Sequence, residues 1–170
     1  LKRSMPASPL VPAAQYKIGM CFYNLSPRSS LDQVYTTRAI DEFQTFIEYY
    51  PTHDSVHDAE AKIIALTNRL AKKLYDSGQL YLRMEFYKAA GIYFNSVIEK
   101  YHDTEFAEPS YIGLAKALNA RKKYDESKQA LEKLLQRFPN SALKDEAVAL
   151  EREAEVHLKP SSSGLSPLKP

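Results

Sequence analysis

The 170-residue sequence contains no tryptophan, a single cysteine, five scattered glycines and no apolar run of the length that a transmembrane helix needs. With one cysteine the chain cannot form an internal disulfide, and the place of Cys21 in an apolar helical pattern predicts a buried thiol. The scattered glycines form no phosphate-binding loop. The net charge of +2 is too close to zero for the strongly basic face that binds nucleic acid. We therefore expect no nucleic-acid partner.

The sequence does contain a pattern that occurs three times, at residues 39–51, 90–102 and 127–139. Each copy has a small residue first, apolar residues four, seven and eight positions later, an aromatic residue eleven positions later and then a Pro or His. Steps of three and four place these side chains on one face of an α-helix that ends at the Pro or His. A helix of this kind buries its apolar face by stacking on copies of itself, so the pattern predicts a helical repeat protein.

Two copies carry the full tetratricopeptide pattern. Gly78 precedes Ala90 by twelve residues, and Ala115 precedes Ser127 by the same interval. Small residues at these four positions let paired helices approach closely, and a large residue such as Phe94 is expected in the core between them. The predicted fold is all-α, a tetratricopeptide-repeat superhelix (α-solenoid) of about three helix pairs plus a C-terminal helix.

The first copy is longer, because its small residue, Gly19, lies twenty residues before Ala39. The eight extra residues are placed near 26–33, where Pro27 and the serines break the helix. The predicted division is 1–12 as the end of a preceding repeat or a flexible lead, 13–53 as the first repeat with its irregular insertion, 54–104 as the second repeat with an extended first helix, 105–141 as the third repeat, 142–158 as a capping helix and 159–170 as a disordered tail.

The strongest metal-like cluster is His53, Asp54, His57 and Asp58. Two His residues four apart on one helix face can chelate a transition metal. However, His53 and Asp54 precede Ser55, where the helix is predicted to start, so the four residues do not share one helix face. We expect no catalytic residues, no metal and no cofactor, and therefore a protein that is not an enzyme.

Charged and aromatic residues outside the core pattern are the candidates for recognition. The run Arg121-Lys122-Lys123 falls at the predicted turn of the third repeat, where it either complements a helix C-terminus or contacts an acidic partner. Phe86 and Tyr93 fall off the core register and are expected on an exposed recognition surface, whereas Tyr81 and Tyr87 occupy repeat-core positions.

Three segments carry a family resemblance: residues 32–36 (Asp-Gln-Val-Tyr-Thr) after the insertion, 68–71 (Asn-Arg-Leu-Ala) on the long helix, and 101–104 (Tyr-His-Asp-Thr). Because of these three segments, residues 15–141 resemble the C-terminal half of the BamD (ComL, YfiO) family of outer-membrane β-barrel assembly lipoproteins. In place of Tyr-His-Asp-Thr at 101–104, the family usually has Tyr-Pro-Asp-Thr. The family has five repeats behind a lipidated N-terminus, so the chain is expected to hold the last three.

The resemblance implies a non-enzymatic scaffold at the periplasmic face of the outer membrane, held there by a lipid anchor. Its implied partner is the last soluble periplasmic (POTRA) domain of the barrel-forming subunit BamA, with unfolded outer-membrane protein segments and other assembly lipoproteins as further partners. Some family members have, where this chain has Tyr93, a basic residue that could pair with an acidic residue of the partner. Because Tyr93 carries no charge, this ionic contact is not carried over to the chain. The predicted partner-binding residues are Arg83, Phe86, Lys88, Tyr93, Arg121 and Lys122.

A second hypothesis is a tetratricopeptide adaptor that clasps an extended tail or a C-terminal carboxylate. Its groove would be lined by residues of the first helix of the second repeat, namely Lys72, Tyr75, Gln79 and Arg83.

Overall fold

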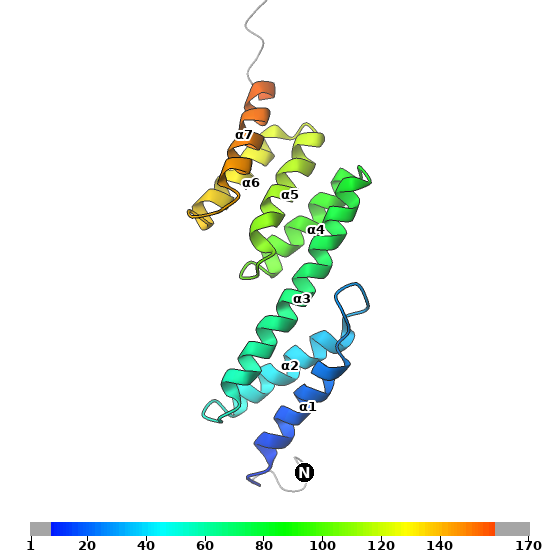
Figure 1. Ribbon diagram of the computed structural model, residues 1–170, viewed down its shortest axis with the longest axis vertical. Helices are drawn as coiled ribbons and strands as arrows, with labels where there is room; N and C mark the ends of the chain where they lie inside the picture. The colour runs from blue at the N-terminus through cyan, green and yellow to red at the C-terminus, as the bar shows by residue number, and fades with distance from the viewer. Residues whose placement is uncertain (1–7, 159–170) are drawn as a thin grey trace, which may run out of the picture. The chain divides into compact units, whose positions relative to one another are not determined.

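A computed structural model describes residues 8–158, and these form seven α-helices and no strand (Figure 1). The all-α prediction is therefore confirmed. The helices are α1 (Val11–Leu25), α2 (Val34–Tyr49), α3 (Val56–Arg83), α4 (Tyr87–Lys100), α5 (Ala107–Ala120), α6 (Tyr124–Arg137) and α7 (Lys144–Leu158). None of these helices is long and apolar enough to cross a membrane. The expectations for 1–7 and 159–170 lie outside the described residues.

The chain divides into two compact units. The N-terminal unit includes 8–76 and 101–106, and the C-terminal unit includes 77–100 and 107–158. The long helix α3 contributes residues to both units. The division into repeats stays a prediction, and each unit is described by itself.

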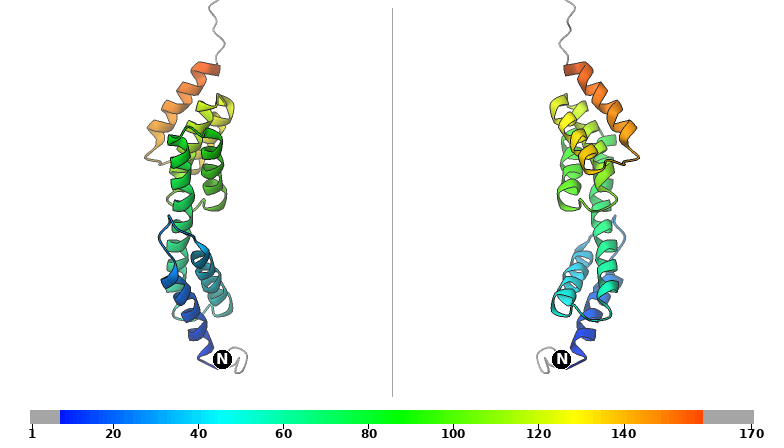
Figure 2. Two further views of the ribbon diagram at one scale, coloured as in Figure 1. Left: turned by 90° about the vertical axis from the view of Figure 1, so that its right-hand side faces the viewer. Right: turned by 90° about the vertical axis from the view of Figure 1, so that its left-hand side faces the viewer.

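In the N-terminal unit, α1 and α2 lie alongside the first part of α3 in both views of Figure 2. Phe43 and Phe46 of α2 and Leu66 of α3 are fully buried between them. Gly19 permits this packing, since a Cβ atom at that position would lie 2.7 Å from Cδ1 of Phe43. Gly19, the small residue of the first copy, therefore lies at a close approach of α1 and α2.

The helix α1 begins at Val11, and Pro12 occupies its first turn, where the missing N–H is not needed. One expectation about this helix needs correction. Cys21 is exposed rather than buried. The buried face of α1 carries Gln15 and Gly19, and a residue two positions after Gly19 is rotated about 200° away from that face.

The predicted insertion connects α1 to α2 as an irregular segment that α3 holds in place. Nη1 of Arg69 donates to the carbonyl oxygen of Ser26 at 3.1 Å and to its hydroxyl at 2.7 Å, and Nζ of Lys73 donates to the carbonyl of Leu31 at 2.8 Å. Backbone groups that no helix satisfies are therefore paired with cationic side chains.

In the C-terminal unit, α5 packs against α4 and α6, and α6 packs against α7. Phe94 of α4 is 0% exposed, which confirms it as a core residue. Its ring lies against two glycines, because an added Cβ would come within 2.8 Å of it at Gly78 and within 2.4 Å at Gly113. Ala147 and Ala154 are the fully buried residues of α7.

Candidate docking surface

Two helix-ending turns of the same geometry position the candidate residues. Glu85, after α3, and Lys122, after α5, adopt the left-handed conformation with φ of 63° and 59°. In the second turn the N–H of Lys123 donates to the carbonyl of Leu118 at 2.9 Å, and an equivalent bond closes the first turn. This is the Schellman motif, in which the left-handed residue is usually glycine. The basic run at 121–123 therefore has a structural role in ending α5.

An exposed apolar patch lies beside the first of these turns. Its centre is formed by Phe86, 56% exposed, and Ile92, 60% exposed. The rim carries Lys88, Arg121 and Glu85. Together with Tyr81, Tyr87 and Ala89 these residues line a shallow hollow of about 680 Å³. Large exposed apolar side chains with a charged rim are typical of protein-binding surfaces.

Three of the six predicted partner-binding residues, Phe86, Lys88 and Arg121, meet at this apolar patch. Arg83 and Lys122 are exposed but do not line it. Tyr93 was expected to be exposed and is half-buried instead, because its ring stacks on Tyr81 with centroids 5.3 Å apart and planes at 12°. Tyr93 therefore supports the ring of Tyr81 that borders the patch.

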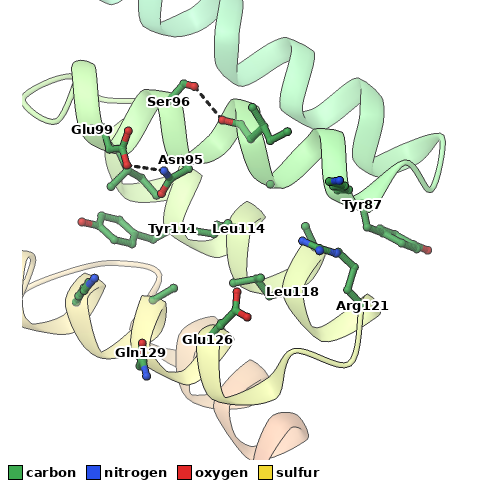
Figure 3. A pocket seen from close by; sticks show the side chains of 17 residues that line it. Tyr87, Asn95, Ser96, Glu99, Tyr111, Leu114, Leu118, Arg121, Glu126 and Gln129 are labelled. Atoms are coloured by element: carbon green, nitrogen blue, oxygen red, sulfur yellow. Dashed lines mark hydrogen bonds between the residues drawn. The ribbon is translucent and has the colours of Figure 1, made fainter.

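The apolar patch continues into a groove of about 720 Å³ (Figure 3). Residues of α4 and α6 form its two walls, and residues of α5, including Leu114 and Leu118, form its floor. Tyr87 and Arg121 lie at one end, and Tyr111 and Glu99 lie at the other. The groove and the patch share Tyr87, Lys88, Ile92 and Arg121.

The sequence reasoning missed Ile92 as a surface residue and missed the groove entirely. The signal for Ile92 was present, since it is a large apolar residue off the repeat-core register of α4. No single stretch of the sequence indicates the groove, because its three sides come from three different helices, and the repeat pattern describes each helix by itself.

One residue of the alternative peptide groove, Lys72, already has partners within the N-terminal unit. Nζ of Lys72 binds both carboxylate oxygens of Asp76, at 3.1 and 3.0 Å, and lies 5.7 Å from the ring centroid of Phe106. Lys72 and Tyr75 belong to the N-terminal unit, whereas Gln79 and Arg83 belong to the C-terminal unit.

The metal-like cluster of the N-terminal unit also has structural partners. The ring of His53 packs edge-on against Phe46 with centroids 5.3 Å apart, and its Nδ1 accepts the N–H of Ser55 at 3.1 Å. Asp58 accepts the hydroxyl of Tyr16 and pairs with Lys62. Across residues 8–158, no three His, Cys, Asp or Glu side chains are grouped in a way that could hold a metal ion.

Comparison with protein families agrees with this architecture. The YfiO model, described as an outer membrane lipoprotein, matches residues 3–123, which is 121 of the 170 residues. The chain belongs to the YfiO family. A tetratricopeptide-repeat model also matches residues 110–141, which include most of α5 and all of α6. No match was found in a comparison with individual curated proteins.

Membership of the YfiO family associates the chain with the outer membrane, and the repeat match confirms a tetratricopeptide-like solenoid. Repeats of this class bind other proteins through surfaces between stacked helices. The apolar patch and the groove are formed by α4, α5 and α6 together with the turn after α3.

Proposed function

We propose that this chain is a non-enzymatic scaffold of the outer-membrane protein assembly machinery. In this proposal it lies at the periplasmic face of the outer membrane and docks the periplasmic (POTRA) domain of the barrel-forming subunit BamA. The observation that carries the proposal is the exposed apolar patch in a chain of the YfiO family, with Phe86 and Ile92 at its centre and Lys88 and Arg121 on its rim.

The composition of the patch suits the docking of a folded domain. Binding energy in such interfaces comes mainly from a few buried apolar or aromatic anchors, and here these would be Phe86 and Ile92. Rim charges such as Lys88 and Arg121 mainly guide the encounter and set its salt dependence. A stable interface buries about 1,200–2,000 Å² in total, so the contact would extend beyond the patch onto neighbouring helices.

The proposal is tested by calorimetric titration of the chain with the soluble periplasmic domains of the barrel-forming subunit. Phe86→Ala should weaken binding by about 2 kcal/mol, or about thirtyfold in Kd, because it removes the central anchor. The matched control is Ile64→Ala, which truncates an apolar residue of the N-terminal unit that is 64% exposed. Equal weakening by both variants, or no binding by the folded chain, would contradict the proposal.

The adaptor hypothesis has less support. A carboxylate clasp would use the cations of Lys72 and Arg83, and Nζ of Lys72 is already bound to Asp76. Unfolded outer-membrane protein segments and other assembly lipoproteins remain further partners suggested by the family, with no residue of this chain singled out for either.

A further inference from the structure

A small hollow of the N-terminal unit is lined by charged side chains from three separate segments of the chain. We infer that it binds a phosphoethanolamine group, with the phosphate beside Arg28 and Arg69 and the ammonium beside Glu105. This chemistry is shared by the headgroup of phosphatidylethanolamine and by its water-soluble derivatives. The inference concerns the N-terminal unit and does not depend on the docking function proposed for the C-terminal unit.

The hollow has a volume of about 330 Å³ and lies within one unit. Its sides come from the irregular segment after α1, from the middle of α3 and from the turn before α5. Small-molecule sites usually have volumes of about 300–1,000 Å³, and this hollow is at the lower end of that range. It therefore suits a small polar group better than a folded domain.

Several hydrogen-bond donors in the hollow have no partner within residues 8–158. The guanidinium of Arg28 and the hydroxyl of Ser29 make no hydrogen bond or ion pair there. The side-chain amide of Asn68 makes none either, and its Oδ1 is buried, which leaves Nδ2 as the accessible end. Donors of this kind, gathered around one space, suit the oxygens of a phosphate diester, which accept hydrogen bonds.

Arg69 is fixed in place and still has donors to offer. Its Nη1 donates to the carbonyl oxygens of Ser26 and Pro27 at 3.1 and 3.2 Å. Its Nη2 and Nε make no hydrogen bond in the described part of the chain. The segment beside it is also held, since Nε2 of Gln33 donates to the carbonyl of Arg28 at 2.9 Å. A site that is already ordered loses less conformational entropy when it binds a ligand.

One carboxylate makes the hollow suit a zwitterion better than a simple anion. Glu105 is exposed and makes no ion pair within residues 8–158. The third cation of the lining, Lys72, is bound to Asp76 at 3.0 Å, so those two charges offset each other. The charges that remain are two guanidinium groups and one carboxylate. A phosphate alone would leave Glu105 close to another anion, whereas the ammonium of phosphoethanolamine gives this carboxylate a partner.

The surroundings of the chain supply the group. The family to which the chain belongs is described as an outer membrane lipoprotein, which associates the hollow with phospholipid headgroups. Arg28 and Glu105 are both exposed, so a headgroup can reach them without opening the core of the unit.

The test is a titration of the ¹⁵N-labelled chain, followed by NMR, with glycerophosphoethanolamine, the water-soluble form of the headgroup. We expect shifts at the backbone amides of Ser29 and Phe106 and at the side-chain amide of Asn68. Arg28→Gln should weaken binding at least about fivefold, because it removes one of the two cations beside the phosphate. Lys17→Gln is the matched control, since it removes an exposed cation of α1 and should bind as the parent does.

A second ligand tests the role assigned to Glu105. Glycerophosphoglycerol has the same phosphate diester but no ammonium, and it should bind the parent at least about fivefold more weakly. Glu105→Gln should remove this preference, whereas Glu60→Gln, at an exposed position of α3, should keep it. The inference is overturned if the three amides do not shift, if the parent binds both compounds equally, or if Glu105→Gln keeps the preference. Equally tight binding of γ-aminobutyrate would also overturn it, because the hollow would then be a carboxylate site.

Nanodiscs distinguish the two sources of the group. If discs of phosphatidylethanolamine shift the same amides, the ligand is the membrane lipid. If only the free headgroup shifts them, the ligand is a soluble derivative. Both results support a phosphoethanolamine site, and neither depends on Phe86, so failure of this inference is distinguishable from failure of domain docking.

Discussion

The packing of Phe94 between two glycines makes a prediction that single substitutions and their combination can test. Phe94→Ala removes a fully buried ring and should lower the free energy of unfolding by about 3–5 kcal/mol. The cost should lie well above that of a surface change, because helices on both sides of the ring approach it through Gly78 and Gly113 and cannot close the cavity completely.

The effect of Gly113→Ala on the free energy of unfolding should depend on the residue at position 94: it should be destabilising beside Phe94 and stabilising beside alanine. In the parent chain the new methyl group would lie 2.4 Å from Cζ of Phe94, and such overpacking costs about 1–3 kcal/mol. Alanine in place of glycine favours a helix by about 1 kcal/mol, so the net loss should be about 1 kcal/mol. In the Phe94→Ala background the clash disappears, and the same change should stabilise the chain by about 1 kcal/mol.

Urea denaturation, followed by far-ultraviolet circular dichroism, measures the free energy of unfolding of four proteins: the parent, Phe94→Ala, Gly113→Ala and the double variant. The coupling energy between positions 94 and 113 should be about 2 kcal/mol. A cost below about 1 kcal/mol for Phe94→Ala, or an equal effect of Gly113→Ala in both backgrounds, would refute the packing argument.

Four further predictions concern the turns, the N-terminal unit and the last helix. Lys122→Gly should raise the free energy of unfolding by about 0.5–1 kcal/mol, seen as a higher urea midpoint, because glycine adopts the left-handed conformation without strain. Burial and the carboxylate of Asp58 raise the pKa of Tyr16 to about 12, above its ordinary value of 10.0. The stability that the protonated Tyr16 hydroxyl contributes is therefore complete below pH 10.0 and is lost as pH rises through 12. The stability difference between the parent and Tyr16→Phe should shrink over that range, and a constant difference would contradict the assignment. Tyr16 and Lys62 lower the pKa of Asp58, so a further loss should appear as pH falls below 3.8, and it should be smaller in Tyr16→Phe. Lys128→Ala removes the contacts to Glu151 and Glu155 at 3.7 and 3.1 Å and should speed amide hydrogen exchange in α7 while leaving α5 unchanged.

The repeat pattern could predict the core because helical periodicity reports burial directly. Phe43, Phe94 and Leu131 occupy the same place in the three copies, and all three are fully buried. Their partners, Gly19 and Gly78, were predicted by spacing alone, and both lie in tight contact with a ring. The insertion at 26–33 was likewise visible as eight surplus residues, although the cations of α3 that hold it were not.

The surface was harder to predict, because exposure depends on neighbours from other helices. Tyr93 lies off the core register but stacks on Tyr81 of the preceding helix. Cys21 lies among apolar residues, but no helix covers its side of α1 in the described part of the chain. The groove is formed jointly by α4, α5 and α6, so no local pattern in the sequence could reveal it.

Site-specific photo-crosslinking in cells tests the docking proposal most directly. The photoreactive residue p-benzoylphenylalanine would replace Ile92 in the apolar patch and, as a control, the exposed Tyr49 of α2 in the N-terminal unit. The account predicts that position 92 crosslinks to the barrel-forming subunit and that position 49 does not. A crosslink to that subunit from position 49 alone, or none from position 92, would contradict it.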